Sequence, residues 1–145
     1  MPTQGDRPYL GCNFLVDLGD GAHPRTGGTG FAEVIFPSFR SASARTRRAA
    51  ATKLPGEGAS RLVLRRGASG ALDLYLWWNQ ARIGKAPKRR TVTVRLLGED
   101  HAQVVTTWRF SNVRPVSLSF TPLNAMEASV LMETIELEFD GVEML

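Results

Sequence analysis

The sequence has almost none of the side chains that form disulfides or bind transition metals. Among its 145 residues there is one cysteine, Cys12, and there are two histidines, His23 and His101. A single cysteine excludes a disulfide within the chain, and these three side chains are too few for a four-ligand zinc site. We therefore expect no metal ion or other cofactor, and a cytoplasmic protein, because structural disulfides mark oxidising compartments.

Long hydrophobic runs are missing as well. No run of eighteen apolar residues occurs, so we predict no transmembrane helix and no membrane insertion by this chain. Residues 1–10 lack the apolar segment of a secretory signal and are interpreted as a polar N-terminal tail. With 43% hydrophobic and 22% charged residues, the composition is that of an ordinary globular domain. We predict a single domain over residues 1–145.

A recognisable catalytic motif is also missing. The sequence contains neither a Gly-x-Ser-x-Gly turn nor a P-loop. Its glycines at 27–30 precede a predicted strand, whereas a dinucleotide-binding loop follows a strand and opens a helix. His101 lies in a predicted turn beside acidic residues, where an exposed histidine is expected. These absences argue against an enzyme.

What the sequence does have is alternation of apolar and polar residues, which predicts β-strands. We expect strands at 11–18, 31–36, 61–66, 91–97, 103–111, 116–120 and 128–139. A turn joins 91–97 to 103–111, which predicts a β-hairpin. Cys12 lies on the apolar face of the first strand, so we expect it in the core. The predicted fold is mainly β, an antiparallel β-sandwich or open barrel with one packed α-helix.

The helix is predicted over residues 71–83. Its apolar stripe at spacings of three and four consists of Leu72, Leu76, Asn79 and Ile83. We expect Ser69 to cap its start and Gly84 to end it in a left-handed conformation. Trp77 and Trp78 are adjacent and cannot share one helical face, so we expect one in the core and the other on a partner surface.

The charges are segregated along the chain. Residues 40–95 hold fourteen Lys and Arg against two acidic residues, and residues 99–145 hold eight acidic residues against two Arg. Surfaces of opposite sign can bind a polyanion, or they can bind each other head to tail between copies. The basic runs 40–53 and 82–95 therefore leave open a small basic nucleic-acid-binding β-domain, although no nucleic-acid-binding motif accompanies them.

One acidic residue stands on an apolar face. Glu133 shares its side of the last predicted strand with Leu131 and Ile135. A carboxylate in that position needs a basic partner. We expect Glu133 to pair with Arg109 or Arg114, or to lie at a contact between subunits; a face that turns to solvent at this point is the remaining alternative.

A series of short motifs occurs in a fixed order along residues 11–141. They are Phe14-Leu15-Val16, Gly30-Phe31-Ala32-Glu33-Val34, Lys53-Leu54-Pro55-Gly56, Leu62-Val63-Leu64-Arg65-Arg66-Gly67, Leu76-Trp77-Trp78, Trp108-Arg109-Phe110-Ser111-Asn112-Val113-Arg114-Pro115, Leu123-Asn124-Ala125 and Glu133-Thr134-Ile135-Glu136-Leu137. With this ordered set, the chain resembles the tail tube proteins of contractile phage tails and of phage-tail-like contractile injection systems.

The resemblance implies a β-sandwich subunit with one helix and no catalytic activity. It also implies a six-membered ring whose strands join into an inner barrel around a lumen, and rings that stack into a tube inside a contractile sheath. The implied partners are further copies of this chain, the sheath protein, the spike, hub or baseplate proteins, and a cargo in the lumen.

In such a tube, residues 38–53 occupy the place of a loop that reaches the neighbouring ring. We expect the basic middle of one copy to meet the acidic end of the next through Arg40, Arg45, Arg47, Arg48, Lys53, Glu133, Glu136 and Glu138. This chain departs from the family pattern at Ile35-Phe36-Pro37 and at 49–51. The departures keep a second role open, a single tube-initiating ring between the spike hub and the tube.

Overall fold

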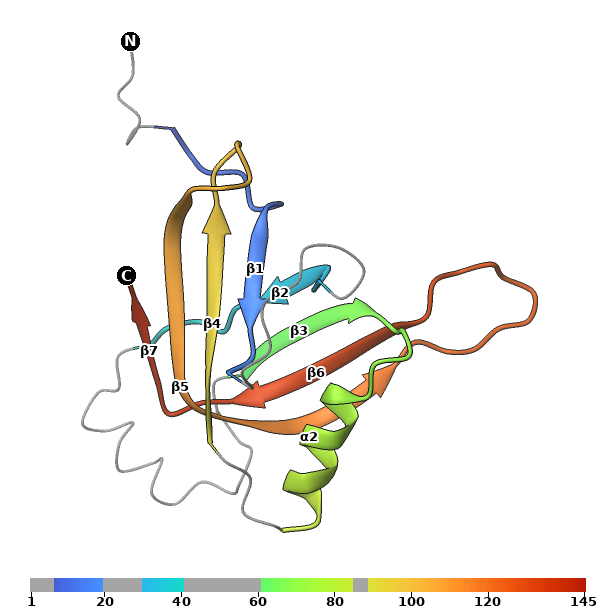
Figure 1. Cartoon of the computed structure of the whole chain (residues 1–145). Helices are drawn as coiled ribbons and strands as arrows, with labels where there is room; N and C mark the ends of the chain where they lie inside the picture. The colour runs from blue at the N-terminus through green and yellow to red at the C-terminus, as the bar shows by residue number, and fades with distance from the viewer. Residues whose placement is uncertain (1–6, 20–29, 41–60, 85–88) are drawn as a thin grey trace.

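The computed structural model describes residues 7–19, 30–40, 61–84 and 89–145, which form strands and one helix (Figure 1). In chain order these are β1 (Phe14–Asp17), β2 (Glu33–Ile35), β3 (Arg61–Gly67), α2 (Asp73–Arg82), β4 (Arg90–Leu97), β5 (Val104–Phe120), β6 (Met132–Glu138) and β7 (Gly141–Met144). The prediction of a mainly antiparallel β fold with one helix is confirmed.

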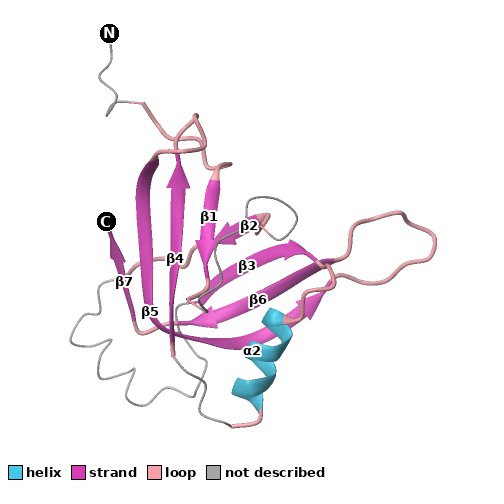
Figure 2. Ribbon diagram, in the orientation of Figure 1, coloured by secondary structure: helices cyan, strands magenta, loops and turns pink. Residues whose placement is uncertain are grey.

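The strands form two antiparallel sheets that share the long strand β5 (Figure 2). The first sheet has the order β1-β4-β5-β7, and the second has the order β2-β3-β6-β5. The N-terminal half of β5 belongs to the first sheet, and its C-terminal half pairs with β6 in the second. The second sheet carries α2 on one of its faces.

β5 passes from one sheet to the other through a bend. Asn112 has a φ of 53°, and the register with β6 shifts between Pro115 and Ser117. Proline has no N–H to donate to a ladder, so it is tolerated at such an irregularity. We predicted two separate strands at 103–111 and 116–120, and this is wrong: the chain continues through Pro115 as one bent strand.

The core lies between the two sheets and the helix. The second sheet contributes the alternate residues of β3 and β6, among them Leu62, Leu64, Ile135 and Leu137. The predicted face of the last strand is confirmed, because Ile135 and Leu137 are buried while the residues between them are only half-buried. Strict alternation in these two strands leaves the second sheet with one apolar face and one hydrated face.

The helix packs on a different face from the one predicted. Leu74 and Trp77 are its buried residues, whereas Leu72, Leu76 and Ile83 are exposed. A short helix on a sheet buries only a narrow stripe, and the large Trp77 side chain with Leu74 three residues earlier fills that contact. The burial of Trp77 confirms the prediction that one tryptophan enters the core. Trp78 is partly exposed beside Tyr75, and its place on a partner surface stays a prediction.

The helix ends and the hairpin are set by local bonds. Ser69 does not cap the helix; its hydroxyl accepts from the Ala71 N–H at 3.4 Å. Gly84 has the predicted left-handed φ of 73°. Between β4 and β5, the Asp100 carboxylate accepts the N–H groups of Ala102 and Gln103, each at 3.1 Å. These bonds hold the pKa of Asp100 below its usual value.

Two further expectations about the strands were wrong. Cys12 is exposed, because β1 begins only at Phe14 and the chain before it does not follow the strand. The last predicted strand, 128–139, starts later and is followed by β7, which we did not predict. β7 pairs with β5 beside the bend, with Val142 opposite Phe110, and completes the first sheet.

Candidate assembly surfaces

The predicted basic contacts lie mostly outside the described residues. Arg45, Arg47, Arg48 and Lys53 belong to residues 41–60, which lie outside the described residues. Arg40 is exposed five residues after the end of β2. Their role in ring contacts therefore stays a prediction.

The predicted acidic contacts are engaged within the subunit. The Glu136 carboxylate accepts a hydrogen bond from Arg61 at 2.8 Å, and Glu138 lies 3.4 Å from Arg114. Arg114 also donates to Asp140 at 3.0 Å, and this interaction lowers the pKa of Asp140. Antiparallel pairing of β3 and β5 with β6 brings the basic middle of the sequence beside its acidic end.

Glu133 lies in the buried interior and not on a contact surface. Its carboxylate pairs with Arg66 of β3, which also donates to Asp73 at the start of α2. Neither expected partner is used, since Arg109 bonds Glu143 at 2.8 Å and Arg114 bonds Asp140. Cross-strand register explains this choice, because Arg66 stands directly opposite Glu133. We therefore leave Glu133 out of the candidate interface.

For Arg66 and Asp73, ion pairing outweighs the effect of burial on the pKa. Burial alone would raise the pKa of Asp73, but the hydrogen bond and charge of Arg66 hold it below its usual value. Burial alone would likewise lower the pKa of Arg66, but its bonds to Asp73 and Glu133 raise it. The guanidinium also lies 5.3 Å from the centre of the Phe31 ring. The cluster ties β3, β6, α2 and the segment just before β2 together.

Among the described residues, each outer strand of the second sheet has one side that pairs with no other strand. Its order places β2 at one edge and residues 117–120 of β5 at the other. The Thr121 N–H donates to the Met132 carbonyl of β6 at 3.0 Å. Because backbone groups alternate in direction along a strand, the Phe120 N–H points to the free side. Free edges of this kind pair readily with another chain.

The two edges are complementary to each other. Neighbouring strands of the second sheet are antiparallel throughout, so its four strands alternate in direction from β2 to β5. The edge of β5 in one copy can therefore pair antiparallel with β2 of the next copy, and the alternation continues. The first sheet also alternates and ends in β1 and β7. However, β4 in that sheet is buried on both faces, whereas β3 and β6 keep one hydrated face.

An apolar arm extends from one end of the second sheet. Residues 121–131 connect β5 to β6 and project well beyond the strands (Figure 1). Leu123, Met126 and Val130 are exposed along it. The sequence signal was present, since apolar residues flank Asn124 in a segment between two strands, but we assigned this arm no role. The sheet edges were missed because strand order is not visible in a local pattern.

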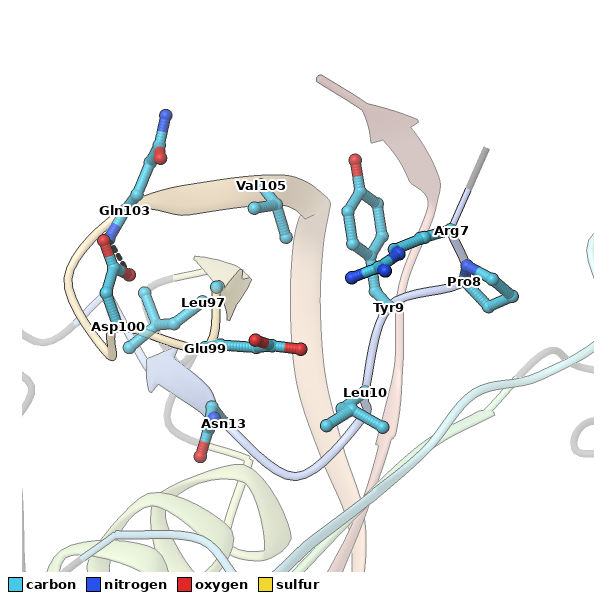
Figure 3. A pocket seen from close by; sticks show the side chains of 11 residues that line it. Arg7, Pro8, Tyr9, Leu10, Asn13, Leu97, Glu99, Asp100, Gln103 and Val105 are labelled. Carbon is cyan, nitrogen blue, oxygen red and sulfur yellow. Dashed lines mark hydrogen bonds between the residues drawn. The ribbon is translucent and has the colours of Figure 1, made fainter. Parts of the chain in front are cut away.

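A small cavity lies at the end of the first sheet that carries the β4–β5 hairpin. It has a volume of about 290 Å³ and lies between residues 7–10 and the tip of the β4–β5 hairpin (Figure 3). Arg7 and Tyr9 stand on one side and Glu99 on the other. The described residues contain no group of three or more His, Cys, Asp or Glu that could hold a metal ion. Within the same residues, no helix is long and apolar enough to cross a membrane.

Comparison with known proteins identifies the family. The model of the family "T4-like virus tail tube protein gp19" matches residues 10–143, nearly the whole chain. A comparison with curated protein sequences gives no significant match.

Several solved structures share the fold of this chain. A chain in the PVC sheath-tube complex of an extracellular contractile injection system, in the extended state, is 21% identical with a TM-score of 0.72, over 100% of this chain and 99% of that one. A chain in the anti-feeding prophage tube-terminating cap is 23% identical with a TM-score of 0.66, over 100% and 99%. Hcp1 from Flavobacterium johnsoniae is 14% identical with a TM-score of 0.56, over 90% and 93%.

The family match settles the class of the protein, and the fold agrees with it. The resemblance inferred from the ordered motifs is confirmed, and so is the prediction that the chain is not an enzyme. The chain belongs to the T4-like virus tail tube protein family and is a structural tube subunit of a contractile phage tail or injection system.

Proposed function

We propose that this subunit closes into a ring by pairing the free edge of β5 with the free edge of β2 in the next copy. The observation that carries the proposal is the second sheet itself, whose four strands alternate in direction and end in two different free edges. Because the two edges differ, the contact is head to tail, and such a contact closes into a ring when its rotation fits. Closure removes both edges.

We further propose six copies in each ring. Six copies of a four-stranded sheet would make a barrel of about 24 strands, a size at which a barrel keeps an open lumen. A baseplate of the anti-feeding prophage, one of whose chains shares this fold at 22% identity, was described with six-fold symmetry. Rings of this kind stack into the hollow tube that the family name describes.

In this ring the hydrated face of the second sheet lines the lumen. The core and α2 cover the opposite face, so the half-buried residues of β3 and β6 turn inward. They include Arg61, Arg65 and Glu136, and the first and last of these are ion-paired. The lumen would be polar with largely balanced charge, which suits passage of a cargo without tight binding to the wall.

The proposed partners follow from the particles in which similar chains occur. One chain of the same fold is part of a sheath-tube complex, and another is part of a baseplate. We propose that this chain likewise lies inside a sheath and meets spike, hub or baseplate proteins, as part of a phage-tail-like particle that carries cargo. The alternative is a single initiating ring, which the family departures at Ile35-Phe36-Pro37 favour.

A proline on the β5 edge tests the ring. Phe120→Pro removes an N–H that points away from β6, so it should block pairing between copies and leave the fold intact. Phe120→Ala keeps the N–H and is the matched control. Native mass spectrometry and negative-stain electron microscopy should show rings for the wild type and Phe120→Ala, and monomers for Phe120→Pro.

Rings from the Phe120→Pro variant would contradict the proposed edge. Stacked rings in the wild type support the tube, and single rings support the initiator. The nucleic-acid-binding alternative would require DNA binding that falls steeply with salt, measured on the same protein.

A further inference from the structure

The arm at residues 121–131 presents apolar side chains to water in a fixed shape. Met126 is 92% exposed and Leu123 is 85% exposed. The Asn124 side-chain oxygen accepts the Met126 N–H at 2.9 Å, and the Asn124 carbonyl accepts the Glu127 N–H at 3.3 Å. These bonds form a tight turn that holds Met126 at its surface. A preformed turn loses little conformational entropy when it binds.

Hydrogen bonds also hold the base of the arm, where its two ends meet. The Thr121 hydroxyl accepts the Met132 N–H at 2.9 Å, and the Thr121 N–H donates to the Met132 carbonyl at 3.0 Å. Figure 1 shows the arm standing clear of both sheets, beyond the ends of β5 and β6. A fixed apolar projection with no cover from its own subunit is typical of a protein contact surface.

A second apolar surface lies on the side of the subunit opposite the arm, where the chain after β2 crosses to the first sheet. β2 starts beside the arm end of β3 and runs away from it, with Ile35 opposite Val63. The chain then passes the first sheet, where the ring centres of Phe36 and Trp108 lie 4.8 Å apart, and continues to Phe39 and Arg40. Phe39 is 53% exposed and Ile35 is also exposed. In Figure 1 this segment leads away from β2 on the side opposite the arm.

In the proposed ring, the arm and the segment after β2 lie on opposite faces, because they lie on opposite sides of the subunit along its strands. Strands in a closed barrel run along its axis with a tilt. In the proposed ring the arms therefore project from one face, and the segments that follow β2 lie on the other. When two rings stack in the same orientation, the arm face of one meets the β2-end face of the next.

The two surfaces are complementary in chemistry. The arm presents an apolar residue followed by an acid, Met126 and Glu127, and the second surface presents an apolar residue followed by a base, Phe39 and Arg40. Glu127 and Arg40 form no ion pair with the residues that the structure describes. Methionine also packs favourably against aromatic rings.

We propose that the arm of each subunit docks on Phe39 and Arg40 of a second copy in the adjacent ring. The proposal rests on the ring described above and names the contact that stacks such rings. It commits to a second copy of this chain because both surfaces belong to one molecule, lie on opposite sides of it and match in polarity and charge. Burial of Met126 and Phe39 against each other supplies the main attraction.

A cysteine pair tests this contact directly. In a Cys12→Ser background, Met126→Cys and Phe39→Cys are introduced together, and the assembled protein is oxidised with copper phenanthroline. The two new cysteines lie on opposite sides of the subunit, too far apart for a bond within one chain. Docking therefore predicts a ladder of covalently linked chains, whereas each single-cysteine variant can reach no more than a dimer.

The control replaces the receiving position. Met126→Cys combined with Tyr75→Cys uses an exposed residue on α2 that is not at the strand ends. Mass spectrometry of the linked peptides should show the bond between positions 126 and 39 several-fold more often than any other bond. A yield no higher than in the control would overturn the docking, and so would bonds mainly between two cysteines at position 126.

Failure of the ring and failure of the docking are separate results. Native mass spectrometry of the unoxidised protein reports the ring, and absence of rings contradicts the proposed function. Rings without the bond between positions 126 and 39 contradict only the docking. As a second readout, Met126→Ser should keep rings intact and weaken each stacking contact by about tenfold, seen as shorter tubes.

Discussion

The two sheets of this subunit are built from the same kind of antiparallel strands, yet they differ in how their faces are used. In the first sheet, β4 is buried on both faces for most of its length. In the second sheet, β3 and β6 alternate between buried and half-buried residues at every position. Burial on both faces marks a sheet inside the subunit, and strict alternation marks a sheet that can face a water-filled lumen.

The largest expected difference between the sheets concerns assembly. Phe120 in the second sheet and Met144 in the first occupy equivalent edge positions, because the Leu145 N–H donates to Thr107 at 2.8 Å and leaves the Met144 N–H on the free side. Phe120→Pro should abolish rings, and Met144→Pro should leave them unchanged. Native mass spectrometry compares the two, and loss of rings only in Met144→Pro would assign the ring contact to the first sheet.

The second sheet should depend on its buried charge cluster for stability. Arg66→Leu leaves the buried Glu133 carboxylate without its partner, so we expect a loss of about 3–5 kcal/mol in the free energy of unfolding. Arg61→Leu breaks a half-exposed pair on the hydrated face and should cost about 1 kcal/mol or less. Urea unfolding in the Phe120→Pro background measures both without a contribution from assembly. Equal losses would contradict the distinction between the two faces.

The first sheet should be sensitive where β1 meets β4. Gly19 has a φ of 71°, and a Cβ atom there would lie 2.4 Å from the Thr91 carbonyl oxygen. Gly19→Ala should therefore lower the free energy of unfolding by about 1–3 kcal/mol. A Cβ atom added at Gly11 would have no other atom within 4 Å, so Gly11→Ala serves as the control. Both variants should still form rings, since neither touches the second sheet.

The smallest expected effect concerns the charges of the arm and of the segment after β2. Glu127→Lys and Arg40→Glu should each weaken stacking by less than about tenfold, because exposed ion pairs contribute about 1 kcal/mol or less. The double variant restores opposite charges and should recover the tube length of the wild type. Tube length at two salt concentrations, measured by electron microscopy, reports this. Additive losses in the double variant would show that the two residues do not meet.

Local patterns were enough to predict the strands of the second sheet and the β4–β5 hairpin. Alternation over residues 61–66 and around Ile135 and Leu137 follows directly from one buried face, so the sequence carries it. The helix was predicted in the right place but on the wrong face. Leu72 and Leu76 have the same spacing as a core stripe, and only the position of the sheet decides that Leu74 and Trp77 are buried.

The assembly surfaces were harder to predict because they depend on long-range pairing. Glu133 was expected to need a basic partner, and it has one, but Arg66 is 67 residues away and is selected by the β3–β6 register. Glu136 and Glu138 were expected at ring contacts and are already engaged by Arg61 and Arg114. The free edges became visible only with the strand order, whereas the apolar arm had a local sequence signal to which we assigned no role.

The most direct test of the central claim is a cryo-electron microscopy reconstruction of the assembled protein. The account predicts residues 117–120 of β5 beside Glu33–Ile35 of the neighbouring copy, antiparallel, with Arg61 and Glu136 facing the lumen. A ring closed through β1 and β7 of the first sheet, with the second sheet turned outward, would contradict it.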